Sequence, residues 1–258
     1  MRTPATLPPL FDADAWIGAW PFALRPEQTA AGLAARLAAA GIARALVSPL
    51  AAVLAPDSMP ANEHLLRETR PYPELLPLPL LDLRLSHWRD DLARLAADAR
   101  IRAIRIAPGW HHFSWNSREI DELADALHLR RLGLVVTARL EDERQRHHAL
   151  RIRGPSVSVL SRLLRRLAPV RVLCTGLYLR EILALAEHDN LFADTAMAEW
   201  DDTFHVLLEK VSARRLCFGS LSPFLSLPAN VAKIRTARLG SRVHRDIACS
   251  NLERFLSP

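Results

Sequence analysis

Charged side chains stand in two β-like segments where an ordinary strand would be apolar. In FDADAWIG, period-2 alternation places Asp12, Asp14 and Trp16 on one face. In IRAIRIAPGWHHF, either Arg102 or Arg105 must point inward, and Arg105 is nearer the end of the segment. By strand order, the nearest carboxylate to Arg105 is Asp12, with Asp142 next. Because unpaired charges are rarely buried, these groups need partners or a ligand. A carboxylate here would suit a general base and the guanidinium a substrate carboxylate, although Asp12 could simply cap the chain or pair with an arginine.

Histidines gather after the fourth and fifth β-like segments. Trp110, His111 and His112 follow the fourth, and adjacent histidines on a loop are a modest signal for acid/base work or ligand binding. In LEDERQRHH, a helical turn would bring Glu143 to His147, as a carboxylate that orients a general base. Exposed loop residues and surface ion pairs would produce the same patterns without any function.

The candidates therefore fall into two predicted roles. The predicted catalytic residues are Asp12, His111, Asp142 and His147. The predicted substrate-binding residues are Trp16, Arg105, Trp110, His112, Arg144, Asp194 and Glu199.

Eight β-like runs alternate with amphipathic helical stretches and must position these residues. The predicted strands are Leu10–Trp16, Ala43–Ser48, Leu75–Leu83, Ile101–Ile106, Leu134–Leu140, Val170–Thr175, Leu191–Thr195 and Arg215–Gly219. The predicted helices are Pro26–Ala40, Ala61–Thr69, His87–Ala99, Ser117–Arg130, Val157–Leu167, Leu179–Glu187, Thr203–Val211, Ala229–Arg238 and Val243–Phe255.

Eight β-then-α units predict an α/β fold, a single (β/α)₈ TIM barrel that spans residues 1–258 as one domain. A doubly wound sheet is the alternative, but it would favour a glycine-rich loop after the first strand, where only Gly18 stands. In a barrel, the active site lies where the strands end, which is where the candidates were found. The proline-dense segment 71–79 is an awkward central strand.

Composition excludes several classes of protein. No apolar run has the length of a membrane helix, and the N-terminus has no apolar signal region. Three widely spaced cysteines predict a cytoplasmic protein without a disulfide framework. The net charge is +6, and 32 of the 34 basic residues are arginine because only Lys210 and Lys233 are lysine. Nine arginines and no acid between Arg144 and Arg180 suggest either a solvated face or attraction of an anion.

The order of several motifs resembles the amidohydrolase-related (family 2) TIM barrels, a group of metal-dependent hydrolases and decarboxylases. FDADAWIG stands where the group has Asp-x-His-x-His-x-Gly, and RLCFGSLSP where it has Phe-Gly-Ser-Asp-x-Pro. ANEHLLRE, RIAPGWHHF and LEDERQRHH fall at the matching places between them. The resemblance implies a hydrolase or a decarboxylase-type lyase of this fold.

The metal ligands that the resemblance implies are replaced throughout. Asp14 and Trp16 stand at the first-strand histidines, and Leu221 stands at the eighth-strand aspartate. Strands five and six end in Thr137-Ala138-Arg139 and Cys174-Thr175. Zinc prefers imidazole and thiolate ligands, so we expect no zinc and no other cofactor. An oxygen-rich Mg²⁺ or Mn²⁺ site through Asp12 and Asp14, with Asp194 and Glu199, is a weaker alternative.

Two functions stay open at this point. In the first, the chain is a hydrolase or lyase that works on a small anionic substrate without the ancestral metal. Asp12 or His147 would act as base, His111 or His112 as acid, and Arg105 would bind the substrate. In the second, it is a pseudoenzyme that binds a small ligand or serves as a structural or regulatory subunit. We expect neither nucleic acid nor a membrane as partner, because Tyr178 is the only aromatic residue among the clustered arginines. A homo-oligomer is possible.

Overall fold

Eight parallel strands form a closed ring in the computed structural model, which describes residues 8–22, 28–147, 149–150 and 152–257. Residues 1–7, on which the signal-sequence prediction rests, lie outside these ranges. The strands are β1 (Leu10–Ile17), β2 (Ile42–Pro49), β3 (Leu75–Pro77), β4 (Ala103–Ile106), β5 (Gly133–Thr137), β6 (Val172–Thr175), β7 (Leu191–Asp194) and β8 (Leu216–Cys217). Isolated parallel bridges join Leu80 to Arg105 and Ala15 to Ser222, which links the β1–β3 group to the β4–β8 group. The predicted (β/α)₈ barrel is confirmed.

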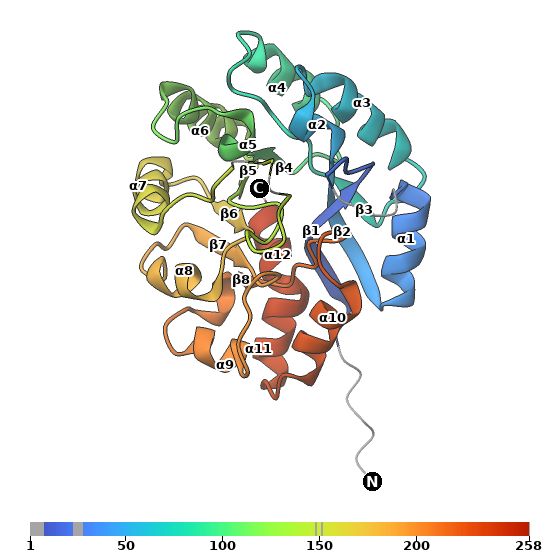
Figure 1. Ribbon diagram of the computed structural model, residues 1–258, viewed down its shortest axis with the longest axis vertical. Helices are drawn as coiled ribbons and strands as arrows, with labels where there is room; N and C mark the ends of the chain where they lie inside the picture. The colour runs from blue at the N-terminus through green and yellow to red at the C-terminus, as the bar shows by residue number, and fades with distance from the viewer. Residues whose placement is uncertain (1–7, 23–27, 148, 151, 258) are drawn as a thin grey trace.

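Helices surround the strands (Figure 1). The main ones are α1 (Ala30–Ala39), α3 (Met59–Glu68), α4 (Trp88–Ala96), α6 (Arg118–Arg130), α7 (Val157–Leu167), α8 (Leu179–Ala184), α9 (Thr203–Leu208) and α10 (Leu227–Thr236). The predicted last helix consists of α11 (Ser241–Arg245), a π-helical segment at Asp246–Ser250 and α12 (Asn251–Leu256). Two short helices were not predicted, α2 (Ala51–Leu54) and α5 (Pro108–His111).

The third strand is much shorter than predicted. Regular pairing with β2 ends at Pro77. Proline has no N–H to donate, so Pro77 and Pro79 interrupt the ladder. The chain nevertheless continues beside β4, because Pro79 O accepts from Arg105 N at 2.9 Å and Leu81 N donates to Arg105 O at 2.9 Å. The ring therefore closes through irregular backbone at this point.

The C-terminal helix closes one end of the barrel. Phe255 and its neighbours on α12 belong to a buried cluster with inward-facing strand residues such as Val135 and Phe192. Figure 1 shows α12 across the centre of the ring. Gly133 makes this contact possible, since a Cβ there would lie 2.6 Å from Phe255 Cζ. The end that α12 covers is the one where the strands begin, so the other end is the site end.

An irregularity in β1 breaks the predicted alternation of its side chains. Phe11 and Ala13 face the inner cluster, whereas Ala15 belongs with the outer layer between strands and helices. The pairing with β2 shifts register between Asp12 and Ala15. The predicted period-2 alternation along FDADAWIG, which would place Asp12 on one face with Asp14 and Trp16, is therefore wrong, because the extra residue of a β-bulge reverses the phase.

In the described part of the chain, no helix is both long and apolar enough to cross a membrane.

Candidate functional site

A buried polar layer crosses the barrel interior between two apolar clusters. Arg105 from β4 and Thr137 from β5 lie beside Asp14 from β1. Thr175 and Asp194 continue the layer from β6 and β7, and all five side chains are at most 1% exposed. Buried charges are tolerated only when they are paired and hydrogen-bonded, so the contacts within this layer determine what it can do.

Arg105 and Asp14 form an ion pair at the centre of this layer. Arg105 Nη2 donates to Asp14 Oδ1 at 2.7 Å, and Nη1 donates to Thr137 Oγ1 at 3.2 Å. The guanidinium stacks on Trp16, with Cζ 4.2 Å from the ring centroid, and Trp16 Nε1 donates to Asp14 Oδ1 at 2.9 Å. The expectation that Arg105 meets a carboxylate holds, but its partner is Asp14. Asp12 and Asp142, the partners named from strand order, bind elsewhere.

Asp12 is bonded to the segment that follows β8. Its Oδ1 accepts from Ser220 N at 2.8 Å and from Asp14 N at 3.0 Å, and Ser220 Oγ donates to Oδ2 at 2.5 Å. Complete burial raises the pKa of Asp12 to about 6, although these hydrogen bonds act in the opposite direction. With a side chain that is 0% exposed, Asp12 is out of reach of a substrate in this conformation.

Asp194 is the second buried acid with a perturbed pKa. Its two oxygens accept from Gly176 N at 3.0 Å and from Ala196 N at 3.1 Å. Burial, reinforced by the charge of Asp14, raises the pKa of Asp194 to about 7.

Lys233 on α10 was missed by the sequence reasoning. Its Nζ donates to the carbonyls of Thr195, Ala196 and Ala198 at 2.6, 3.1 and 3.1 Å, which fixes the turn after β7. Burial lowers the pKa of Lys233 to about 8, and the charge of Asp194 opposes this shift. A search confined to strand ends could not find a helical residue, but one signal was present, because this is one of only two lysines in the chain.

Aromatic and aliphatic side chains seal the end of the barrel above the polar layer. Trp20 meets Trp110 and Phe224 edge to face, with ring centroids 5.2 and 5.3 Å apart, and Leu221 packs in the same cluster as Trp16. Trp20 Nε1 donates to Glu141 Oε1 at 3.0 Å, which ties the seal to the loop after β5. Predicted as a substrate contact, Trp110 is only 8% exposed and serves as part of this seal.

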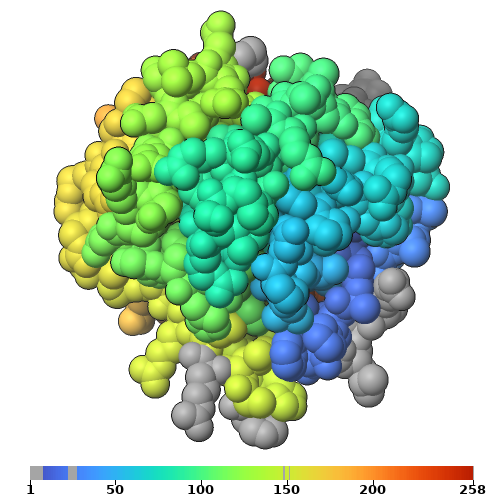
Figure 2. Space-filling model, turned by 90° about the horizontal axis from the view of Figure 1, so that it is seen from above, coloured from blue at the N-terminus to red at the C-terminus, as the bar shows by residue number. Residues whose placement is uncertain are grey.

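The loop after β5 is held over this end by a second ion-pair network. Arg139 donates to both carboxylate oxygens of Glu181 at 2.7 Å, donates to Glu143 at 3.1 Å, and stacks on Tyr178. Figure 2 shows the yellow-green segment near residue 150 projecting from one end of the molecule. Glu143 pairs with Arg139 and Arg146 in a turn, so the predicted helical alignment of Glu143 with His147 is wrong.

Three further candidates meet on the outside of the barrel. Arg144 Nη2 lies 2.5 Å from Asp142 Oδ2 and 3.5 Å from Glu199 Oε2. Arg144 and Glu199 are 72% and 64% exposed, so solvent screens the charges of this group. Hydrogen bonds from Arg144 hold the pKa of Asp142 below its ordinary value.

The predicted histidines do not converge on the polar layer. His111 is buried at the start of the fourth loop, where its Nε2 lies 3.1 Å from Ala52 O and its Nδ1 lies 3.8 Å from Asp82 Oδ1. Burial lowers the pKa of His111, which favours the neutral ring. His112 is exposed, and its backbone has a positive φ of 52°. His147 is also exposed, and its ring centroid lies 6.2 Å from that of Phe22.

The residues present do not fit the metal that the resemblance implies. Asp14 Oδ1 already accepts from Arg105 and Trp16, both oxygens of Asp194 accept backbone N–H groups, and Leu221 supplies no ligand atom. Zinc and manganese sites need several nitrogen, oxygen or sulfur atoms converging on one point. No set of three or more His, Cys, Asp or Glu side chains converges in this way among the described residues. The alternative set with Glu199 is dispersed between the interior and the surface.

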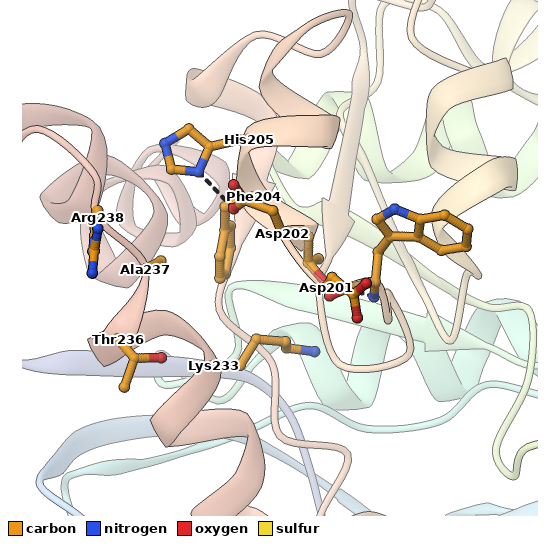
Figure 3. A pocket seen from close by; sticks show the side chains of 10 residues that line it. Asp201, Asp202, Phe204, His205, Lys233, Thr236, Ala237 and Arg238 are labelled. Atoms are coloured by element: carbon orange, nitrogen blue, oxygen red, sulfur yellow. Dashed lines mark hydrogen bonds and ion pairs between the residues drawn. The ribbon is translucent and has the colours of Figure 1, made fainter.

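A cavity of about 340 Å³ opens on the outer side of the barrel between α9 and α10. Trp200, which is 62% exposed, is among its lining residues, together with Lys233 of α10 and Phe204 of α9 (Figure 3 shows Lys233 and Phe204). Asp202 Oδ1 bonds to His205 Nδ1 at 2.6 Å, and Arg238 lines the cavity near His205. Arg238 makes no hydrogen bond or ion pair with the part of the chain that the structure describes, so its charge is available to a ligand.

No protein-family model matches the sequence, and no curated relative matches it. Solved structures match over almost the whole length. A 5-carboxyvanillate decarboxylase from Sphingomonas paucimobilis is 12% identical, with a TM-score of 0.73, over 96% of this chain and 98% of that one. A dihydroxybenzoic acid decarboxylase from Polaromonas sp. JS666, with bound manganese, is 12% identical, with a TM-score of 0.71, over 96% of each chain. Amidohydrolase 2 from Bifidobacterium longum subsp. infantis is 15% identical, with a TM-score of 0.64, over 96% and 98%. The likeness that the sequence motifs imply is thus confirmed as one of fold: this chain has the barrel fold of these structures over almost its whole length.

Proposed function

We propose that this chain is a catalytically inactive relative of these enzymes, which binds a small ligand at its surface. The observation that carries the proposal is the burial of every charged group in the barrel interior. Asp12, Asp14, Arg105 and Asp194 are each 0% exposed, and Trp16 and the seal residues lie between them and solvent. An enzyme of this fold needs its reacting groups within hydrogen-bond reach of a substrate at this end of the barrel.

The internal contacts favour the same reading. Asp14 and Arg105 are paired with each other, and Asp12 is saturated by Ser220 and the Asp14 N–H. A carboxylate or guanidinium whose charge and hydrogen bonds are already used by a neighbouring residue is poorly placed to polarise a substrate. The polar layer is therefore suited to hold the barrel together, and the chemistry of the similar structures does not transfer with the fold.

The cavity between α9 and α10 is the best place for a ligand. Trp200 offers a flat apolar face, and Arg238 offers a planar cation that suits a carboxylate. Lys233 fixes the turn that leads to Trp200, so this part of the cavity lining is formed before any ligand binds. A small aromatic carboxylate would use both features, and this agrees with the small anionic partner expected from the sequence.

Benzoate is a suitable probe of this cavity. We expect saturable binding to the wild-type chain by isothermal titration calorimetry, and at least a tenfold weaker association with Trp200→Ala and with Arg238→Ala. Arg242→Ala is the matched control, because Arg242 is an exposed arginine outside the cavity. Equal binding by all four proteins, or no binding by any, would contradict the ligand site.

The catalytic part of the proposal is tested separately with the substrates named for the similar structures. We expect no decarboxylation of 5-carboxyvanillate or of 2,6-dihydroxybenzoate, which the names of two similar decarboxylases give, by the wild-type chain, with or without added manganese. Turnover that Asp12→Asn abolishes would contradict the proposal.

A metal-independent hydrolase or lyase is the second candidate. The observation in its favour is the pair of buried acids, Asp12 and Asp194, whose pKa values lie at about 6 and about 7. Groups with perturbed pKa values cluster at catalytic sites, although structural networks produce them as well. This function would require the loop after β5 to move away from the barrel end, and turnover in the assay above would favour it.

A further inference from the structure

We infer that Arg105 supplies, from within the chain, the positive charge that a bound cation supplies in a metal-containing barrel. The centre of this barrel is then a cation site that the Arg105 side chain occupies. The inference concerns how the interior is held together, so it stands apart from whether the chain has catalytic activity.

The balance of charge in the interior points to this role. Asp14 and Asp194 bring two carboxyl groups to the polar layer, and Asp12 is buried nearby against Ser220. Of these three acids, Asp14 is the one that meets a guanidinium directly. Lys233, the other cation near the layer, directs its ammonium to backbone carbonyls instead. Without Arg105, the Asp14 carboxylate would be buried with no positive neighbour among the residues that the structure describes. Such a charge is strongly destabilising.

The surroundings of the guanidinium are those of a bound ion. One face lies on Trp16, at 4.2 Å from its centroid, and the edge meets the oxygens of Asp14 and Thr137. Thr175 Oγ1 lies 3.4 Å from Thr137 Oγ1, which adds a further oxygen behind this contact. Arg105 Nε has no hydrogen-bond partner in the described structure, so part of the donor capacity of this arginine is unused. The main contribution of the Arg105 side chain is therefore its positive charge, and its hydrogen bonds are incomplete.

This arrangement also explains why the implied metal does not fit. Arg105 already pairs with Asp14 Oδ1, and a divalent cation at Asp14 Oδ2, which has no hydrogen-bond partner in the described structure, would lie beside the guanidinium and be repelled by it. Shortening Arg105 would leave a space lined by Asp14, Thr137 and Trp16, with carboxylate and hydroxyl oxygens of the kind that Mg²⁺ and Mn²⁺ accept. The same space would fit a free guanidinium ion.

Comparison of Arg105→Lys with Arg105→Met separates charge from packing. Both replacements are unbranched, but only lysine keeps the positive charge. We expect Arg105→Met to melt about 10 °C below the wild type, with Arg105→Lys clearly above Arg105→Met. The double variant Asp14→Asn/Arg105→Met should regain most of the loss, because it no longer buries an unpaired carboxylate. If Arg105→Met is as stable as the wild type or more stable than Arg105→Lys, the inference is wrong.

Rescue by an added cation tests the site itself. Low millimolar guanidinium chloride, or Mn²⁺, should raise the melting temperature of Arg105→Ala in a saturable way, because only the folded variant binds the ion. The wild type and Asp14→Asn/Arg105→Ala should not respond, and sodium chloride at equal ionic strength controls for screening. Equal shifts in all three proteins, or none in a folded Arg105→Ala, would overturn the inference. If Arg105→Ala does not fold, the lysine and methionine comparison decides. Turnover by the wild type would contradict the proposed function and leave these outcomes unchanged.

Discussion

The raised pKa values of Asp12 and Asp194 make the stability of the barrel depend on pH. Burial raises their pKa values to about 6 and about 7, from an unfolded value of about 4. The folded state therefore holds these protons more tightly than the unfolded chain. The stabilisation from this source is complete below about pH 4 and is lost as the pH rises to about 7.

We expect this loss to be visible in urea unfolding between pH 4 and pH 7. A pKa raised by about two units corresponds to as much as about 3 kcal/mol for one group. His111, His188 and His244, whose pKa values burial lowers, act in the opposite direction below about pH 6.5. Asp194→Asn removes one contribution and leaves the histidines in place, so its stability should fall less steeply with pH than that of the wild type. Parallel pH profiles would show that Asp194 does not titrate in this range.

The residue scale also shows what the sequence could predict about the site. Arg105 was expected to face inward because it stands near the site end of its strand, and to meet a carboxylate because an unpaired buried charge is costly. Its partner was misassigned to Asp12 because strand order alone does not reveal a shift within β1. Lys233 was missed because it stands on a helix, away from the strand ends, and its contact with the β7 turn is to backbone carbonyls.

At the scale of elements, α12 depends on the absence of a side chain at the start of β5. Gly133→Ala would place a Cβ 2.6 Å from Phe255 Cζ, so the helix must shift or the ring must turn. We expect a loss of about 1–3 kcal/mol of unfolding free energy, as for other overpacked cores. Gly240→Ala is the matched control, since no atom lies within 4 Å of the added carbon. Gly133→Ala/Phe255→Leu should be more stable than Gly133→Ala. An equal effect of the two glycine substitutions would refute the packing explanation.

The loop after β5 depends on the pairing of Arg139 with Glu181. Arg139 is 8% exposed and Glu181 is 15% exposed, so removal of the acid leaves a cation partly buried without its main partner. Glu181→Ala should lower the stability by about 1–3 kcal/mol and increase tryptic cleavage within residues 141–155. Glu199→Ala removes an exposed carboxylate near Arg144 and should change neither. Unchanged cleavage in Glu181→Ala would show that the pair does not hold the loop.

Element boundaries were predicted well where one physical signal dominated and poorly where two competed. The helix Val157–Leu167 was predicted with its exact bounds, because its leucines recur at helical spacing and Ser156 caps its start. The third strand was overestimated, because its leucines suggested a continuous strand while its prolines removed the N–H groups that a ladder needs. The β1 bulge could not be predicted, since alternation is the only signal that a short strand offers.

At the scale of the whole molecule, eight alternating units were enough to predict the barrel, and function did not follow from it. The order of motifs over the chain identified the fold despite an identity of 12–15% with the similar structures. A dihydroxybenzoic acid decarboxylase of similar fold holds bound manganese, whereas the interior of this chain is filled by its own side chains. The fold therefore does not by itself predict the site, because packing and chemistry are carried by different residues of a barrel.

Metal content is the most direct test of this interpretation. The wild-type chain would be produced in medium supplemented with manganese and zinc, dialysed without a chelator, and analysed by inductively coupled plasma mass spectrometry. Because the Arg105 guanidinium pairs with the Asp14 carboxylate and would repel a second cation there, we expect far less than one manganese or zinc per chain. A stoichiometric metal that survives dialysis, and that Asp14→Asn removes, would contradict the claim that the chain fills its own cation site.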